Sequence, residues 1–410
     1  MMVAPAWPEA RVAAHGLGAQ LATGHELVPL DRSTGRTLAT DVIATAALPG
    51  FDTSAMDGWA VAAGGPWTLM GTARAGAPWV GTLDAGQAVS IATGTRVPPG
   101  ADAIVRSEDG TVGSDDIAGS DGRLTSAAVV PGRDIRPMGE ECSEGEVLAR
   151  AGAVVTPALA GLAAAVGHDA LDVRSAPSVS VIVFGDEIAF TGRPGSEKVR
   201  DSLGPQLPAW LQLMGSGDVV VSHARDTLEA HVAALDEASS ADIIVTTGGT
   251  ARGPVDYVRA AIAARGGSLM LDTVAVRPGH PMLLATMPGA RDPGGEVPVL
   301  GLPGNPQSAI IALVSLGWPL LSGMLGRPLP PLGSARLEES LAAPAREHRL
   351  VAGMRGDADV FSPSTHLGSA MMRGLVDATG FAVLPPGGAA SGELVGWQPL
   401  PLSLTHGGAR

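Results

Sequence analysis

Residues 179–187 read VSVIVFGDE, and this stretch decides the fold class of the chain. A nearly continuous apolar run is typical of a strand buried on both faces of a parallel sheet. Further apolar runs, at 218–221, 243–245 and 297–300, alternate with segments of helical pattern. The helical segments are predicted at 205–214, 228–235, 255–264 and 307–321. This alternation predicts βαβ units and an α/β fold with a mostly parallel sheet.

On both sides of this region the pattern changes. Residues 8–17 and 157–166 are expected to form helices, and short apolar runs between Gly and Pro turns make residues 40–110 β-rich. The stretch 108–123 is acidic and glycine-containing, which predicts a surface loop. Residues 326–333 read as a linker, and residues 334–410 have the short runs of a small all-β domain.

Composition excludes several classes of function. The chain has 410 residues and a net charge of -14, which argues against nucleic acid or an anionic membrane as its main partner. Cys142 is the single cysteine, so disulfides within the chain and cysteine-based metal sites are excluded, and a cytoplasmic location is expected. We see no secretory leader, and the apolar stretch 309–321 is shorter than the ~20 residues that span a bilayer.

Four loops at the expected carboxyl ends of strands carry candidate chemistry: 185–187, 201–205, 246–253 and 301–306. Ligands of open α/β sheets bind at that edge, and glycines allow backbone N–H groups to approach an anion. The carboxylates Asp186, Glu187, Asp201 and Asp256 lie on or beside these loops. They predict a site for a phosphate ester with bridging Mg²⁺. The alternative is that Gly and Asp serve only as turn residues. The loop 249–253 lacks the Lys-Ser/Thr of a P-loop.

Two further segments could carry chemistry. The sequence RPGHP at 277–281 offers a permanent cation and a titratable one, which suits an oxyanion, although a solvated turn is the alternative. The sequence LPGFDTSAMDGWA at 48–60 combines acids, hydroxyls and aromatics. Within it Asp57 could bind a metal or cap a helix.

This last segment resembles the signature of the molybdopterin molybdenumtransferases, the MoeA and gephyrin E-domain family. Further matches follow in the family's order: 91–94, 97–103, 139–141, 185–187, 201–202, 247–249, 277–279, 302–306 and 368–369. The resemblance implies a multidomain fold of α/β and β parts. An elongated domain covers 1–45 and 135–175, and an inserted β-rich domain covers 46–134. An α/β molybdopterin-binding domain at 176–326 and a C-terminal β-barrel at 327–410 complete the expected fold.

The resemblance also implies an activity: insertion of molybdate into adenylylated molybdopterin, dependent on Mg²⁺, with release of AMP and molybdenum cofactor. The family's homodimers place each active site between two subunits. One subunit would supply Asp57, Thr93 and Glu141, and the other Glu187 and Asp256. The metal would be held by Asp57, Glu187 and Asp256. Substrate would contact Asp186, Asp201, Ser202, Thr247, Gly248, Gly249, Arg277, His280, Pro303, Gly304, Asn305, Pro306 and Ser369. Molybdopterin adenylyltransferase and molybdoenzyme acceptors are further expected partners.

The sequence departs from the family's pattern at several of these places: Phe184 replaces Thr, Leu203 replaces Asn, Arg225 and Pro254 replace Asp, and Arg277 and His280 replace Lys. Glu141 stands where Asp is common. Two alternatives to molybdenum insertion therefore stay open. One is adenylylation of molybdopterin, and the other is a non-catalytic molybdopterin-binding or scaffold protein.

Overall fold

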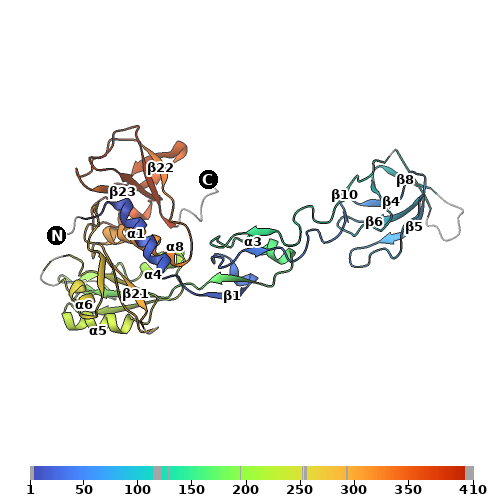
Figure 1. Ribbon diagram of the computed structural model, residues 1–410. Coiled ribbons are helices and arrows are strands. Elements are labelled where there is room, and N and C mark those ends of the chain that lie inside the picture. The colour runs from blue at the N-terminus through green and yellow to red at the C-terminus, as the bar shows by residue number, and fades with distance from the viewer. Residues whose placement is uncertain are drawn as a thin grey trace.

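The computed structural model describes residues 4–113, 122–127, 129–193, 195–251, 253, 256–291 and 294–401. The molecule is elongated, with a thick lobe at one end, a thin arm in the middle and a β-rich module at the far end (Figure 1). The lobe holds the α/β sheet together with the C-terminal strands. Of the predicted acidic surface loop at 108–123, residues 114–121 lie outside the described part.

The sheet of the lobe has the strand order β16-β13-β17-β21-β20-β18. Its first four strands run parallel: β16 (Val219–Ala224), β13 (Val179–Phe184), β17 (Ile243–Thr247) and β21 (Glu296–Leu302). At one edge β20 (Leu283–Pro288) pairs antiparallel with β21, and β18 (Ser268–Leu271) pairs antiparallel with β20. The predicted mostly parallel sheet is confirmed. Because β13, β17 and β21 are neighbours, the loops after them meet at one edge.

Helices connect and cover these strands. The connecting helices are α4 (Leu207–Met214), α5 (Leu228–Ala238) and α6 (Val258–Ala264). Small strands β14 (Ile188–Ala189) and β15 (Val199–Arg200) pair between β13 and α4. After β21, the helix α7 (Pro306–Ala312), a π-helical turn η1 (Leu313–Gly317) and α8 (Trp318–Met324) form one helical run.

This run, Pro306–Met324, is 19 residues long and apolar enough to cross a membrane, and an apolar window of 18 of its residues is wholly buried inside the protein. The helical run is thus longer than the predicted helix at 307–321, because it begins one residue earlier and continues to Met324, with Pro319 in the first turn of α8. Most of its residues belong to the hydrophobic core of the lobe, as in the core helix of a folded domain.

Helix α1 (Trp7–Gln20) packs against α8, far along the chain. The indole of Trp7 donates a 2.7 Å hydrogen bond to Ser315 Oγ. A Cβ at Gly18 would lie 2.0 Å from the carbonyl oxygen of Leu320, so only glycine allows this approach. The predicted boundaries place 1–45 in the elongated domain by chain order, whereas α1 packs in the core of the lobe.

The arm consists of short paired strands and two helices. β1 (His25–Pro29) pairs with β12 (Ala170–Arg174), and β2 (Val42–Ile43) pairs with β11 (Val147–Ala149). The helices are α2 (Leu30–Ser33) and α3 (Pro157–Ala165), and Thr156 caps α3 as its sequence predicts. A small apolar cluster that includes Leu38, Val155 and Val173 holds the arm together.

The module at the end of the arm is a sheet with the order β7-β4-β6-β5-β9-β8. Its strands are β4 (Gly58–Val61), β5 (Trp67–Ala73), β6 (Gln87–Ile91), β7 (Ala103–Arg106), β8 (Gly110–Gly113) and β9 (Arg123–Ser126). Beside it, β3 (Thr53–Ser54) pairs with β10 (Ile135–Arg136), where the chain enters and leaves the module.

The C-terminal strands close into a barrel. Its strands are β22 (Gly333–Leu337), β23 (His348–Arg355), β24 (Val360–Pro363), β25 (Gly380–Leu384) and β26 (Leu394–Pro399), and the pairing of β23 with β25 completes the ring. The helical segments η2 (Asp357–Asp359) and α9 (Arg373–Val376) lie between these strands in the chain. β19 (Val276–Arg277) pairs with β23, so the lobe's sheet domain and the barrel are tied by backbone hydrogen bonds. The predicted barrel is confirmed.

Candidate functional site

A cavity of about 700 Å³ opens at the carboxyl ends of β13, β17 and β21. This is the edge at which the four loops were predicted to meet, and each of the four contributes to the wall. Eleven predicted site residues line it: Glu187, Asp201, Ser202, Thr247, Gly248, Gly249, Asp256, Pro303, Gly304, Asn305 and Pro306. Phe184, Leu203, Ala370 and Met372 add apolar surface.

Three carboxylates lie in this wall and differ in their surroundings. Asp201 is buried, and its Oδ1 accepts hydrogen bonds from the backbone N–H groups of Leu203 at 3.0 Å and Gly204 at 2.9 Å. Asp201 therefore shapes the turn that leads to α4. The Asp256 carboxylate is half-buried and accepts a hydrogen bond from the backbone N–H of Gly253. The Glu187 side chain is exposed and is free to meet a ligand.

Backbone conformation explains the two glycines after β17. Gly248 has φ of 81° and Gly249 has φ of 62°, in the left-handed region that side chains other than glycine rarely adopt. A Cβ on Gly248 would also lie 3.1 Å from the carbonyl oxygen of Phe184. The chain can therefore turn sharply under the cavity and leave its backbone accessible to a ligand.

The barrel contributes to the opposite side of the cavity. Ser369 does not itself line the wall, but its carbonyl accepts hydrogen bonds from the N–H groups of Gln307 at 3.1 Å and Ser308 at 3.3 Å. Its hydroxyl lies 3.5 Å from the Asn305 amide nitrogen. Ser369 thus joins the barrel to the first turn of α7.

Phe184, which replaces the family's usual Thr, lies at the cavity floor and stacks on His231 with ring centroids 3.6 Å apart. His231 is fully buried, and its Nδ1 is 2.9 Å from the carbonyl oxygen of Thr227. Burial lowers the pKa of His231, so the ring is neutral and the proton resides on Nδ1. The substitution at 184 is therefore accommodated by an aromatic stack.

The loop after β13 has a neighbour that the sequence did not reveal. The Asp226 carboxylate accepts a hydrogen bond from the Asp186 N–H at 3.2 Å, and Arg225 Nε lies 3.4 Å from Asp186 Oδ1. The family often has Asp at the position of Arg225, but in this chain the acid next to the loop is Asp226. The sequence could have indicated Asp226, because this residue follows β16, the strand that lies beside β13 in the sheet. Asp186 does not line the cavity, and Pro254 lies outside the described residues.

Arg277 and His280 are placed beside the cavity by a third residue. Arg277 Nε donates a 2.8 Å hydrogen bond to Glu347 of the barrel, and His280 Nδ1 lies 3.3 Å from the other oxygen of that carboxylate. Pro281 lines the wall, whereas Arg277 and His280 do not. Glu347 was absent from the predicted site because no motif marks it, yet it partly neutralises the predicted oxyanion-binding pair.

The remaining predicted residues lie on the arm and its module. Asp57 Oδ1 accepts hydrogen bonds from the Thr93 N–H at 2.7 Å and the Thr93 hydroxyl at 2.9 Å. These two bonds lower the pKa of Asp57 and keep its carboxylate ionised. Thr93 is thus a direct partner of Asp57, and the helix-cap alternative for Asp57 is wrong because no helix begins there.

Glu141 is exposed in the turn between β10 and β11, and its N–H bonds the carbonyl of Leu48 at 2.9 Å. The strands that flank Asp57 are at the far end of the molecule from β13 and β17 (Figure 1). One chain does not bring Asp57 to Glu187 and Asp256. Correspondingly, in the parts of the chain that the structure describes, no three His, Cys, Asp or Glu side chains gather to hold a metal ion.

Comparison with known proteins adds independent findings. Residues 8–167 match a family model described as "MoeA N-terminal region (domain I and II)", and residues 180–323 match a "Probable molybdopterin binding domain". The chain is 35% identical over 340 residues to molybdopterin molybdenumtransferase 2 of Mycobacterium tuberculosis, covering 77% of this chain and 80% of that one. It is 32% identical over 384 residues to the molybdopterin molybdenumtransferase of Synechococcus elongatus, covering 90% and 92%.

A solved structure agrees in fold across nearly the whole chain. It is the molybdopterin biosynthesis MoeA protein of Pyrococcus horikoshii, with a TM-score of 0.80 and 26% sequence identity. The likeness covers 97% of this chain and 99% of that one.

Proposed function

Because the chain belongs to the molybdopterin molybdenumtransferase family, we propose that the cavity at the sheet edge is where it inserts molybdate into adenylylated molybdopterin. The chain is a transferase of molybdenum cofactor biosynthesis, and AMP is the product released with the cofactor. One observation carries the assignment of the site. The cavity gathers ten predicted residues from four separated loops, together with Asp256 beside them, at the edge where α/β sheets bind ligands.

The chemistry of the wall suits a phosphate ester. Two glycines in the left-handed conformation leave backbone accessible after β17, and α7 begins at Pro306, directly after Asn305. Such backbone favours anions. The apolar surface of Phe184, Leu203 and Met372 suits the ring system of a pterin.

The carboxylates fit Mg²⁺. Glu187 and Asp256 both line the cavity, and Mg²⁺ is commonly held by one or two carboxylates together with substrate phosphates. When bound, the ion would neutralise the charge of the phosphates. Arg277 and His280 would attract the molybdate oxyanion from beside Pro281. Positioning and charge neutralisation would then favour replacement of two molybdate oxygens, which leave as water, by the two pterin sulfurs. AMP would be released by hydrolysis of the phosphoanhydride bond that joins it to molybdopterin.

A second copy of the chain would complete the site with Asp57, Thr93 and Glu141. The arrangement of one chain supports this, since the Asp57 segment is at the far end of the arm from the cavity (Figure 1). We further propose a cytoplasmic location, with substrate supplied by molybdopterin adenylyltransferase and product passed to molybdoenzyme acceptors. The chain's one cysteine, Cys142, is free and buried, as a reducing compartment permits.

The decisive experiment incubates the purified protein with adenylylated molybdopterin, Mg²⁺ and molybdate. AMP release together with active cofactor is the expected result. Consumption of ATP with bare molybdopterin, or binding without turnover, would overturn the proposal in favour of adenylylation or of a scaffold.

Subunit mixing tests the shared site. Asp57→Ala and Glu187→Ala proteins are each expected to be inactive. In a mixed dimer one of the two sites would keep both residues, so random mixing should restore about a quarter of wild-type activity. If each chain used its own Asp57 and Glu187, every site in the mixture would stay defective and no activity would return. The matched control is a Glu229→Ala protein, in which an acid outside the proposed site is removed from the exposed first turn of α5.

A further inference from the structure

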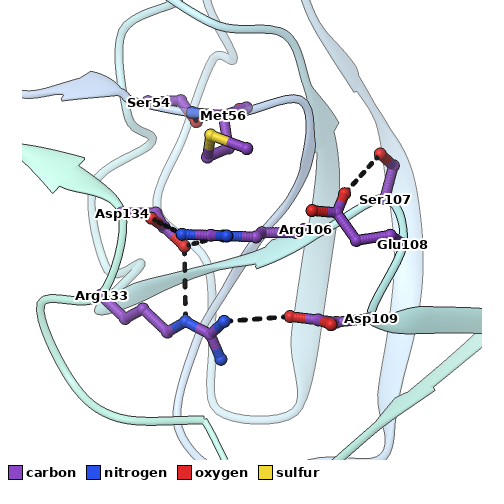
Figure 2. A network of polar contacts seen from close by, with 8 residues as sticks. All are labelled: Ser54, Met56, Arg106, Ser107, Glu108, Asp109, Arg133 and Asp134. Carbon is purple, nitrogen blue, oxygen red and sulfur yellow. Dashed lines mark hydrogen bonds and ion pairs between the residues drawn. The ribbon is translucent and has the colours of Figure 1, made fainter.

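We infer that Arg106 and Asp134 are positioning residues, which together hold Asp57 in its place on the module. This inference rests on the proposed function, since it concerns the residue that the arm would contribute to the active site. Figure 2 shows the pair with its neighbours.

The side chains of Arg106 and Asp134 form a two-pronged ion pair. Arg106 Nε donates to Asp134 Oδ2 at 2.8 Å, and its terminal nitrogen donates to Oδ1 at 2.9 Å (Figure 2). The Asp134 side chain is only 13% exposed. The guanidinium lowers the pKa of Asp134 and so keeps it ionised. A bidentate pair of this kind fixes orientation as well as distance.

Backbone hydrogen bonds at Asp134 and at the residue after Arg106 also hold the Asp57 loop. The Asp134 carbonyl accepts a 2.8 Å hydrogen bond from the N–H of Ala55, two residues before Asp57. On the other side, Ser107 follows Arg106 and donates its N–H to the Asp57 carbonyl at 3.0 Å. Arg106 itself stands opposite Gly58 in the pairing of β4 with β7. Residues 55–58 are therefore held between β7 and Asp134, the residue before β10, which the ion pair joins.

The backbone conformation of Asp134 makes the placement of residues 55–58 depend on the Arg106–Asp134 ion pair. Its φ is 58°, in the left-handed region that costs most residues about 1–2 kcal/mol and that Asp and Asn tolerate best. The next residue, Ile135, starts β10 opposite Ser54. With Asp134 fixed by Arg106, the carbonyl of Asp134 faces Ala55 while β10 stays in register with β3. The pair thus transmits a fixed backbone geometry to Asp57 and its partner Thr93.

The same network contains a natural control. Arg133 lies 3.4 Å from Asp134 Oδ2 and bonds Asp109 at 3.0 Å, with both side chains of that outer pair about 40% exposed (Figure 2). Arg133 does not belong to the two-pronged Arg106–Asp134 ion pair. Arg133→Gln removes a charge from the network and leaves that ion pair and both backbone hydrogen bonds in place.

The test compares Asp134→Asn and Arg106→Lys with Arg133→Gln in the full-length protein. Asp134→Asn keeps the shape and the tolerance of positive φ, and Arg106→Lys keeps the charge, but both lose the two-pronged pair. We expect kcat for AMP release to fall about tenfold in both, because small misplacement of a reacting group is costly. KM for adenylylated molybdopterin should stay within about twofold, since the cavity that binds it is unchanged. Arg133→Gln should match wild type.

A crystal structure of Asp134→Asn supplies a readout that is independent of activity. The expected result is a longer separation between Asp57 Oδ1 and Thr93 N than the present 2.7 Å. The inference is wrong if the Asp57–Thr93 pair is unmoved, or if kcat falls equally in Arg133→Gln. Should wild-type protein release no AMP while the pair moves, the proposed function fails and the positioning role stands.

Discussion

The cavity wall and the Asp57 segment both present carboxylates, but the two regions place them by different means. In the wall, Glu187, Asp201 and Asp256 come from loops that follow adjacent strands, so the topology of one sheet brings them together. On the module, Asp57 is placed by hydrogen bonds from Thr93 and by the backbone bonds of Ala55 and Ser107. One region has a cavity with apolar surface, and the other has an exposed pair of side chains.

This difference indicates how each region should respond to mutation. A sheet edge places its loops through many backbone hydrogen bonds, so a single substitution removes chemistry there without moving its neighbours. The Asp57 carboxylate is held by two hydrogen bonds from Thr93, so substitutions beside Asp57 should act through geometry and protonation.

Glu187→Gln should lower kcat/KM for AMP release by about a hundredfold or more, because it removes a charge from the wall proposed to bind Mg²⁺ while keeping the shape. The thermal midpoint should change little, since the side chain is exposed. Steady-state kinetics and a melting curve measure both. A large loss of stability instead would show that Glu187 also supports the sheet edge.

Thr93→Val should reduce activity less, by about tenfold, and should also change its pH dependence. The Thr93 bonds lower the pKa of Asp57, and the substitution removes the hydroxyl bond while keeping the N–H bond. The pKa of Asp57 should therefore rise, and the acid limb of the kcat/KM profile should move to higher pH. Thr111→Val, on exposed β8, is the control, and an unmoved acid limb in Thr93→Val would contradict the assignment.

Glu347→Gln should tighten molybdate binding by about threefold, because Arg277 and His280 would lose the carboxylate that now competes for their charge. The KM for molybdate measures the effect, and Glu338→Gln elsewhere on the barrel is the control. Weaker binding in Glu347→Gln would mean that holding Arg277 in place matters more than its net charge.

The smallest expected effect concerns stability. Burial lowers the pKa of His231, so the unfolded chain takes up a proton near pH 6.5 while the folded state does not. The free energy of unfolding should therefore fall as the pH drops below about 6.5, by at most about 1.4 kcal/mol per pH unit from this group. His231→Phe should lessen that slope in denaturant titrations at pH 7 and pH 5. Thr111→Val, which removes no titratable group, should leave it unchanged.

The sequence predicted the sheet and its ligand edge because apolar runs and Gly-Asp loops are local signals. VSVIVF forms β13, and the loops after β13, β17 and β21 line one cavity. Other features depend on packing between distant segments. Asp226, Glu347 and the Phe184–His231 stack have no local pattern, because each acquires its role only through a neighbour on another element. The packing of α1 in the lobe was missed for the same reason.

The contact of α1 with α8 also bears on the order in which the protein is made. Trp7 leaves the ribosome early, yet Ser315, its hydrogen-bond partner, is translated 308 residues later. Closing such a loop costs about 5 kcal/mol of chain entropy, less whatever the intervening domains recover by folding first. The arm and module pair their own strands and can fold meanwhile, so α1 waits exposed. Nascent chains halted before residue 306 should therefore carry an unprotected first helix that proteases cut.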